Sequence, residues 1–439
     1  EVPDDVRLFQ LLEGPLELGL VPDSAERVVL KVISPQPAGL TETLRTIRNL
    51  GPTVVEEMRI PLLLPEGKRA WMERLRIEAD AAMISEVHRQ PERLRDALRA
   101  IYEERATDDP LNALVLMQGL DWREVEVLRT FRNHLLQVRP NYNVETVTAV
   151  LVRNSPVAGA LFRLFDARFD PQREGDRADA VAKAETLVER AFSAVGSLFD
   201  DEILRGVENL VRAAVRTNTY QSPERPVLAI KVDCAKVDAM VSPRPLFEIY
   251  VHSRLLEGIH LRGGKVARGG IRWSDRHDDF RTEVLGLMKT QMVKNSVIVP
   301  VGSKGGFVLK GDVPPRPALD AYLIDRYREF VSGLLDVTDN LVDGIVLHPP
   351  EVVRHDEPDP YLVVAADKGT AHLSDTANRV SAQYGFWLGD AFASGGSNGY
   401  DHKREGITAR GAWECVRHHF GNLGLDVQSE PFTMAGIGD

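Results

Sequence analysis

Basic side chains and paired glycines gather in residues 261–307, where together they suit a binding site for an anion. Between Arg262 and Lys304 the chain has nine Lys/Arg and four Asp/Glu, although its formal net charge over 439 residues is -11. Three glycine pairs punctuate this stretch: Gly263-Gly264, Gly269-Gly270 and Gly305-Gly306. Because glycine has no Cβ atom, we expect the backbone here to approach a bound molecule closely, and the cations favour a negatively charged one.

A helix between the second and third glycine pairs is expected to present polar groups to this ligand. Four apolar positions share one face at the spacing of a helix: Phe280, Val284, Leu287 and Met288. This pattern predicts a helix over Arg281–Asn295, and Gln291, Lys294 and Asn295 continue the apolar face. Since polar groups on a buried face are costly without partners, we expect the last turn to meet the anion.

The composition restricts the class of protein. The length favours about two or three domains, and 43% hydrophobic with 27% charged residues is typical of a soluble globular protein. No apolar run approaches the roughly 20 residues of a membrane span, and the first residues do not resemble a signal peptide. We therefore expect a cytoplasmic protein without a membrane partner. The acidic balance argues against nucleic acid as the main partner.

The two cysteines, Cys234 and Cys415, lie far apart and outside any CxxC motif. Neither a disulfide framework nor a zinc site is indicated. The histidines His402, His418 and His419 also lack the spacing of metal ligands. We therefore expect no metal.

The order of elements divides the chain into four parts. Residues 1–62 predict a small α/β module, with strands over Arg27–Ser34 and Thr53–Ile60 and a helix over Leu40–Leu50. Residues 63–226 are predicted to be mainly helical, in segments such as Arg74–Val87 and Trp122–Val138. Residues 227–430 are predicted to be α/β, and 431–439 to begin a further domain.

Within the α/β part, four segments have the apolar, β-branched character of strands: Val227–Val232, Leu246–His252, Ser296–Val301 and Tyr361–Ala366. Residues 303–306 are predicted to be a loop. A last strand, Phe432–Ala435, runs into Gly436-Ile437-Gly438, which begins a dinucleotide-binding fingerprint without its third glycine or helix. We interpret the chain as a fragment that stops at the start of a Rossmann cofactor domain.

Several strings of the second half resemble, in the same order, the large NAD-specific bacterial glutamate dehydrogenase family. They are ARGGIRWSDR, DFRTEVLGLMKTQMVKN, VPVGSKGGFV, VVAADKGTA and YGFWLGDAFASGGSNGYDHKREGITARGAWE. The resemblance is dense from about residue 231 to 439 and looser from about 108 to 221. It implies an α/β substrate domain of the amino-acid dehydrogenase type with a mixed sheet. The helical part would precede this domain, and residues 1–62 would be an ACT-like regulatory module.

The resemblance also implies an activity, the reversible oxidative deamination of L-glutamate to 2-oxoglutarate and ammonia with NAD as cofactor. The partners would be glutamate, 2-oxoglutarate and ammonium, and the protein would be a homo-oligomer, either a tetramer or a hexamer. Such chemistry needs cations for two carboxylates, a lysine that exchanges a proton, and a carboxylate that assists it.

Each role is implied for a residue that matches a family motif. Lys304 matches the catalytic lysine and Asp367 the catalytic aspartate. Gln291 and Lys294, three residues apart on one helix face, match the groups that bind the substrate α-carboxylate.

The side-chain carboxylate is less directly matched. Arg268, with Gly269 and Gly270 after it, is expected to bind the substrate. Arg268 stands where the smaller hexameric relatives have a lysine, and Lys265 is the alternative. Matches to the cofactor-binding segments are Ser397, Thr408, Gly436 and Gly438.

Two other classes remain open. One is another α/β enzyme that holds an anionic substrate in basic glycine loops, although no GxxxxGK[ST] motif is present. The other is a non-catalytic regulatory or scaffold fragment, against which the presence of both Lys304 and Asp367 argues. The choice of NAD over NADP rests on the resemblance alone, because it depends on residues after Asp439.

Overall fold

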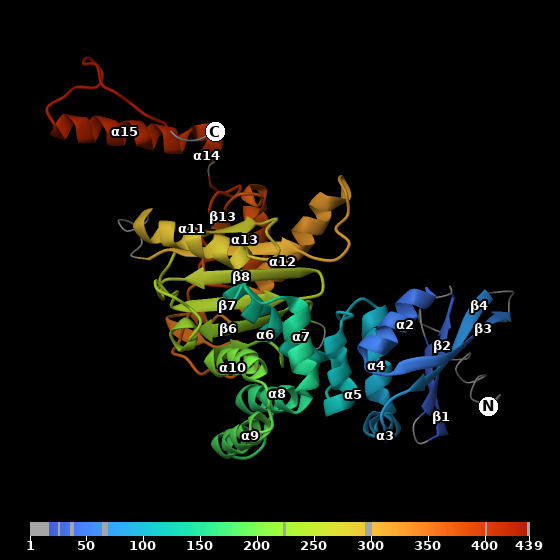
Figure 1. Cartoon of the computed structure of the whole chain (residues 1–439). Helices are drawn as coiled ribbons and strands as arrows, with labels where there is room; N and C mark the ends of the chain where they lie inside the picture. The colour runs from blue at the N-terminus through green and yellow to red at the C-terminus, as the bar shows by residue number, and fades with distance from the viewer. Residues whose placement is uncertain are drawn as a thin grey trace.

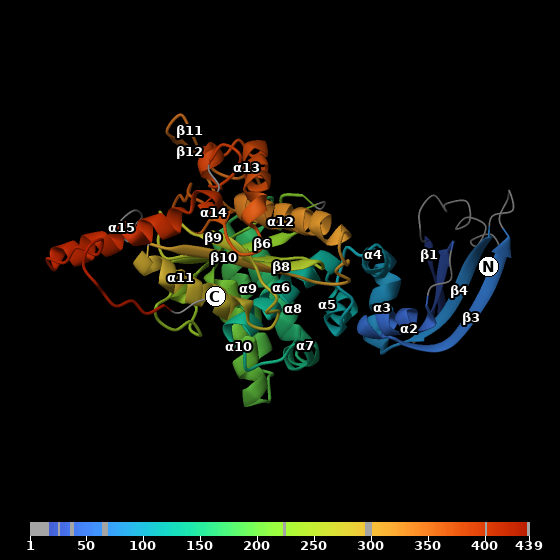
Figure 2. The same cartoon turned by 90° about the horizontal axis from the view of Figure 1, so that it is seen from above.

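The computed structural model describes residues 17–24, 27–35, 39–63, 69–222, 225–294, 301–399 and 402–436. Along the chain, a small sheet, a group of helices, a larger sheet and an outlying helix follow one another (Figure 1). The small sheet and the last helix lie at opposite ends of the molecule in both views (Figures 1 and 2).

The first sheet has four antiparallel strands in the order β1-β2-β4-β3. Its strands are β1 (Glu17–Ser24), β2 (Arg27–Ser34), β3 (Thr53–Leu63) and β4 (Arg69–Glu78), with helix α2 (Leu40–Asn49) between β2 and β3 in sequence. The predicted strands Arg27–Ser34 and Thr53–Ile60 and the predicted helix are confirmed. Because β4 lies between β2 and β3, the sheet extends beyond the predicted boundary at residue 62, to Glu78.

The predicted helix over Arg74–Val87 is wrong in its first half, which belongs to β4. Leu75 and Ile77 are fully buried and alternate with more exposed residues, which is the two-residue period of a strand. Helix α3 begins only after Asp80, whose side chain accepts a hydrogen bond from the backbone nitrogen of Met83 at 2.8 Å. The apolar residues of this short segment fit the spacing of a helix as well as that of a strand. The segment forms a strand because it pairs with β2 on one side and β3 on the other.

The helical part was largely predicted, and Trp122–Val138 has the predicted ends. Its helices are α3 (Ala81–Arg89), α4 (Pro91–Tyr102), α5 (Leu114–Gln118), α6 (Trp122–Val138), α7 (Val144–Arg153), α8 (Ser155–Phe169), α9 (Arg177–Phe192) and α10 (Leu198–Ala213). Helix α6 starts with a capping box, in which Asp121 and Glu124 each bond the other's backbone nitrogen at 2.8 Å.

In the described part of the chain, the larger sheet has seven strands in the order β13-β9-β10-β8-β7-β6-β5. They are β5 (Ala214–Thr217), β6 (Leu228–Asp233), β7 (Phe247–His252), β8 (Leu256–Arg262), β9 (Gly270–Trp273), β10 (Ser303–Leu309) and β13 (Ala365–Ala366). Strands β5 to β8 and β10 pair antiparallel, whereas β10, β9 and β13 pair parallel. The predicted mixed sheet is therefore confirmed.

Helices cover both faces of this sheet. Helices α6 and α11 (Phe280–Lys294) pack on one face, and α12 (Ala318–Asp336) and α13 (Ser374–Gln383) on the other. The remaining elements are β11 (Asn340–Val342), β12 (Ile345–Leu347), α14 (His402–Glu405) and α15 (Ile407–Asn422). Helix α15 is exposed along most of its length and projects beyond the sheet (Figure 1).

Four sequence predictions in this part have other outcomes. Residues 303–306, predicted as a loop, belong to β10. Only Ala365–Ala366 of the predicted strand Tyr361–Ala366 pairs, because its neighbour β9 begins at Gly270. Residues 431–436 have no regular structure, so the predicted strand Phe432–Ala435 is wrong, since no described strand offers it a partner. Most of the predicted strand Ser296–Val301 lies outside the described residues.

A buried charged cluster holds the start of α11 on the sheet. Glu248 of β7 is fully buried and accepts hydrogen bonds from Arg281 Nη2 at 2.8 Å and from the His134 ring at 2.6 Å. Burial alone would raise the pKa of Glu248, but the Arg281 charge and the His134 hydrogen bond lower it to about 2. Phe280, also fully buried, packs beside this cluster at the first residue of α11. The cluster therefore fixes the helix that faces the candidate site.

Replacing Arg281 with methionine should destabilise the protein by about 3–5 kcal/mol, because it leaves the buried Glu248 carboxylate without its main cation. The shift in denaturant midpoint measures this. The lowered pKa of Glu248 means that the pair stabilises the fold above the ordinary carboxylate pKa and loses its effect as the pH falls toward 2. Arg276→Met, which breaks an exposed pair with Asp279, is the matched control and should leave the denaturant midpoint nearly unchanged.

Candidate active site

Lys304 and Asp367, which are 63 residues apart in sequence, meet at the edge of the larger sheet. Lys304 is the second residue of β10 and is buried. Its Nζ donates a hydrogen bond to Oδ2 of Asp367, which directly follows β13. The predicted proximity of these two residues is confirmed, whereas their catalytic roles remain predictions.

The glycines beside Lys304 serve close packing. A Cβ atom on Gly306 would lie 2.5 Å from Cγ2 of Val284 on α11, and one on Gly305 would lie 2.9 Å from Cγ1 of Ile271 on β9. Both distances are shorter than carbon atoms can approach without displacement. The expectation that this pair gives a ligand access is therefore wrong, because both sides of the strand are already filled by protein.

In the second glycine pair, Gly269 also allows close packing. A Cβ atom on Gly269 would lie 1.6 Å from the carbonyl oxygen of Ser303. The neighbouring backbone also joins the two strands, since the Ser303 nitrogen donates to the Arg268 carbonyl at 3.0 Å. Glycine at position 269 thus lets the chain before β9 lie against the start of β10, and Gly270 then begins β9.

Asp367 also contacts a second cation, Arg272 of β9, whose Nε lies 3.1 Å from the same oxygen, Oδ2. Burial alone would raise the pKa of Asp367. The hydrogen bond and charge of Lys304 and the charge of Arg272 outweigh burial, so its pKa is lowered. The carboxylate is therefore ionised at neutral pH.

Arg272 was not predicted as a site residue. The sequence did contain a signal for it. Arg272 lies two residues after Gly270, and residues two apart in a strand share one face, so Arg272 could have been placed on the same face as the glycine pair.

Helix α11 approaches this edge through its last turn. Gln291 is half-buried there, and a Cβ atom on Gly302 would lie 2.6 Å from Cβ of Gln291. The predicted apolar face of the helix is confirmed at Phe280, Val284 and Met288, which are fully buried, whereas Leu287 is only half-buried. Lys294 ends the helix, and its side chain lies outside the described residues.

Arg268 and Lys265, the two alternatives for the substrate side-chain carboxylate, have different surroundings. Arg268 is half-buried, and its Nη2 donates to Oγ of Ser394 at 3.3 Å. With the loop 394–399 it lines a cavity of about 340 Å³. Lys265 is exposed. The structure therefore favours Arg268.

The residues predicted to bind the cofactor do not come together in the described structure. The backbone nitrogen and Oγ of Ser397 both donate to Oδ1 of Asp375, at 2.8 and 3.1 Å. Thr408 is exposed on α15, and Gly436 lies in the irregular segment after it. Gly438 lies outside the described residues. The roles of these residues in cofactor binding remain predictions.

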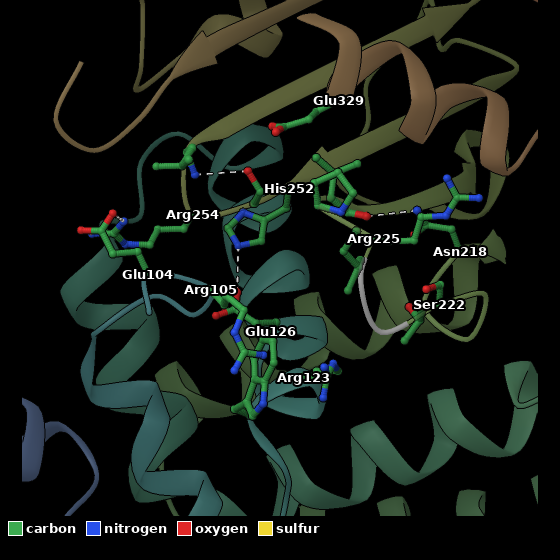
Figure 3. Close-up of a pocket in the computed structure, with 17 residues that line it drawn as sticks. Glu104, Arg105, Arg123, Glu126, Asn218, Ser222, Arg225, His252, Arg254 and Glu329 are labelled. Carbon is green, nitrogen blue, oxygen red and sulfur yellow. Dashed lines mark hydrogen bonds and ion pairs between the residues drawn. The ribbon is translucent and has the colours of Figure 1, made fainter. Parts of the chain in front are cut away.

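A cavity of about 290 Å³ lies elsewhere, where the start of α6 meets the end of β7 (Figure 3). None of the predicted site residues lines it. Two pairs of lining residues already bind each other. The His252 ring lies 3.1 Å from Oε2 of Glu126, and Arg254 lies 2.9 Å from Glu104. Arg254 and Arg225 lie on opposite sides of it (Figure 3). Because it holds none of the predicted site residues, this cavity is a weaker candidate than the Lys304–Asp367 pair.

Two kinds of feature are absent from the part of the chain that the structure describes. No group of three or more His, Cys, Asp or Glu residues there is arranged to hold a metal ion. No described helix combines the length and apolar character needed to cross a membrane.

A family comparison decides what this site belongs to. The family model "Bacterial NAD-glutamate dehydrogenase, catalytic domain" matches residues 187–439, which include Lys304 and Asp367. The chain belongs to this family. A second model, "Glutamate dehydrogenase, helical motif 3", matches residues 106–171, which contain α5 to α8. The glutamate dehydrogenase resemblance recognised in the sequence is confirmed.

Similar proteins with the name NAD-specific glutamate dehydrogenase occur in several bacteria. That of Halomonas elongata is 44% identical over 452 residues, covering 100% of this chain and 28% of the relative. That of Pseudomonas aeruginosa is 46% identical over 415 residues, covering 92% and 25%. That of Mycobacterium tuberculosis is 45% identical over 424 residues, covering 92% and 26%. The chain thus spans about a quarter of the length of these glutamate dehydrogenases.

Proposed function

We propose that the protein containing this chain catalyses the reversible, NAD-dependent oxidative deamination of L-glutamate to 2-oxoglutarate and ammonia. The observation that supports this most is the ion pair of buried Lys304 with half-buried Asp367, inside the segment that matches the glutamate dehydrogenase catalytic domain. NAD would accept the hydride from the substrate α-carbon. The choice of NAD rests on the names of the relatives.

The two central residues would move the protons of this reaction. Oxidation of the amine leaves an iminium carbon, which water must attack before ammonia departs, so protons pass to and from water and nitrogen. Lys304 is proposed to exchange these protons, because it is a buried amine in direct contact with the Asp367 carboxylate. Asp367, ionised and in contact with Lys304, is proposed to share them.

Substrate carboxylates would be held by the surrounding cations and amide. Gln291 and Lys294 are proposed to bind the α-carboxylate from the last turn of α11, and Arg268 the side-chain carboxylate. The position of Arg268 beside the cavity formed with loop 394–399 supports this. An arginine suits the task because its planar guanidinium donates two parallel hydrogen bonds to a carboxylate.

Replacing Arg268 with alanine should raise KM for glutamate about 10–100-fold, since a hydrogen bond between charged groups contributes about 1.5–3 kcal/mol. The binding of NAD should remain unchanged. Lys265→Ala is the matched control, because Lys265 lies three residues earlier in the same segment and is exposed. If Lys265→Ala instead gave the large increase in KM, the assignment of the two residues would be reversed.

A direct assay separates the proposed activity from its alternatives. The complete protein that contains this chain is purified, and the formation of NADH is followed with and without L-glutamate. Glutamate-dependent NADH formation supports the proposal. Its absence would favour a non-catalytic scaffold, or an α/β enzyme for another anionic substrate.

We further propose that the protein is a homo-oligomer, either a tetramer or a hexamer, and that it is cytoplasmic. Light scattering of the complete protein would test the oligomeric state.

The N-terminal sheet remains a proposed ACT-like regulatory module. Its four antiparallel strands and the helix α2 support this, and strands β1, β2 and β4 share one apolar core with the helices that follow. Deletion of residues 1–78 from the complete protein should change the response of activity to small-molecule effectors while leaving the Lys304–Asp367 site intact.

A further inference from the structure

A chain of polar contacts continues from Asp367 away from Lys304. Arg272 Nε lies 3.1 Å from Asp367 Oδ2, and Arg272 Nη1 donates to Oε1 of Glu283 at 2.8 Å. Ser274 Oγ then donates to the other oxygen, Oε2 of Glu283, at 2.6 Å. These contacts join β13, β9 and α11, which are the elements around the candidate active site.

Arg272 is held from two sides. Its planar guanidinium binds one carboxylate through Nε and another through Nη1, a geometry that a lysine cannot reproduce. Glu283 is itself fixed, because Ser274 is buried and holds its second oxygen. Burial would raise the pKa of Glu283, but the Ser274 hydrogen bond and the Arg272 charge lower it, so Glu283 is an anion. Arg272 is therefore a fixed cation.

Both Lys304 and Arg272 contact the same oxygen of Asp367. Two cations on Oδ2 fix the rotation of the carboxylate about its Cβ–Cγ bond. Oδ2 therefore faces Lys304, with which Asp367 is proposed to share protons, and Arg272 holds this oxygen in that position.

We propose that Arg272 is a positioning residue for catalysis, which orients the Asp367 carboxylate toward the substrate, with Glu283 and Ser274 holding Arg272 in place. This rests on the proposed function, because it assigns a part to Arg272 in the same proton transfers. The substrate itself does not need to contact Arg272.

Steady-state kinetics of the complete enzyme test the proposal. Arg272→Met should lower kcat about 10–100-fold, because misplacing a reacting group by about 1 Å has effects of this order. KM for glutamate should change less than about threefold, since the carboxylate-binding residues are untouched. Loss of the Arg272 charge removes one of the contributions that lower the pKa of Asp367, so the acid limb of the pH profile should move to higher pH.

Arg272→Lys separates charge from orientation. The acid limb should return toward that of the wild type, because the positive charge is restored. The kcat should stay low, because an ammonium cannot bind both carboxylates in the plane of a guanidinium. Arg276→Met, four residues further along and in an exposed pair, is the control and should leave both quantities unchanged.

A double-mutant cycle decides whether Arg272 acts through Asp367. If it does, Arg272→Met in an Asp367→Asn background should lower kcat by less than about twofold beyond Asp367→Asn alone. Losses that multiply would overturn the proposal and make Arg272 an independent contributor or a merely structural residue.

A wild-type protein without glutamate-dependent activity would contradict the proposed function and not the role of Arg272. Crystal structures of the wild type and Arg272→Met then decide the second question. In the variant the Asp367 carboxylate should rotate and no longer present Oδ2 to Lys304. An unchanged carboxylate would overturn the proposal.

Discussion

Replacing Lys304 with arginine should lower turnover by about 10²–10⁴-fold while leaving the protein folded. Arginine keeps the positive charge that pairs with Asp367, but it cannot lose its proton near neutral pH. If Lys304 exchanges protons with water and the departing amine, the charge alone is not sufficient. Lys304→Ala should be equally slow, because it removes both the charge and the proton.

The measurement is turnover with glutamate and NAD across the pH range, with NAD binding as the test of folding. Lys310→Arg is the matched control, since it makes the same substitution one residue beyond the end of β10. Lys310 forms a 2.7 Å ion pair with Glu257, so this control also replaces a paired lysine with the larger side chain. Near-normal turnover of Lys304→Arg would rule out proton transfer by Lys304.

The glycine pair next to Lys304 shows where sequence reasoning reaches its limit. Local propensity predicts a turn for residues 303–306, because glycine weakens a strand and favours loops. The structure makes them a strand, since the chain must pass between Val284 of α11 and Ile271 of β9 without side chains. That requirement comes from residues outside the segment, so the local sequence does not contain it.

Helix α11 shows the opposite case. Its apolar face was predicted from spacing alone, and Phe280, Val284 and Met288 are fully buried as expected. The helix has 15 residues, and three of its four predicted apolar positions fall on the buried side at helical spacing, which was enough to identify that side. The strand β4 is shorter, and its end fits a helical spacing as well as a strand spacing. The helix predicted from Arg74 is therefore wrong there, because β4 pairs with β2 and β3.

The candidate site was predictable only in part. The motifs of the glutamate dehydrogenase family pointed to Lys304 and Asp367, and the structure brings them together. Arg272 was missed, because its approach to Asp367 depends on the parallel pairing of β9 with β13, in which Ile271 lies opposite Ala366. A register of two short strands is set by tertiary packing and cannot be obtained from their sequences.

Replacing Asp367 with asparagine should also lower turnover by about 10²–10⁴-fold, because the amide has the shape of the carboxylate but cannot accept a proton. The variant leaves Lys304 and Arg272 facing each other without the anion between them. The measurement is kcat for glutamate oxidation, with circular dichroism as the test of folding. Asp279→Asn, which affects only an exposed pair with Arg276, is the control.

The pH dependence of unfolding gives a second, independent test of Asp367. Its pKa is lowered in the folded protein, so ionised Asp367 stabilises the fold above the ordinary carboxylate pKa, and this contribution is lost as the pH falls through the folded value. Asparagine has no such contribution at any pH. Wild type should therefore be the more stable protein near neutral pH, and the difference should shrink as the pH falls below about 4. A difference that did not change with pH would mean that Asp367 is not held as an anion by Lys304 and Arg272. Full turnover of the asparagine variant would leave the carboxylate only a structural part in the site.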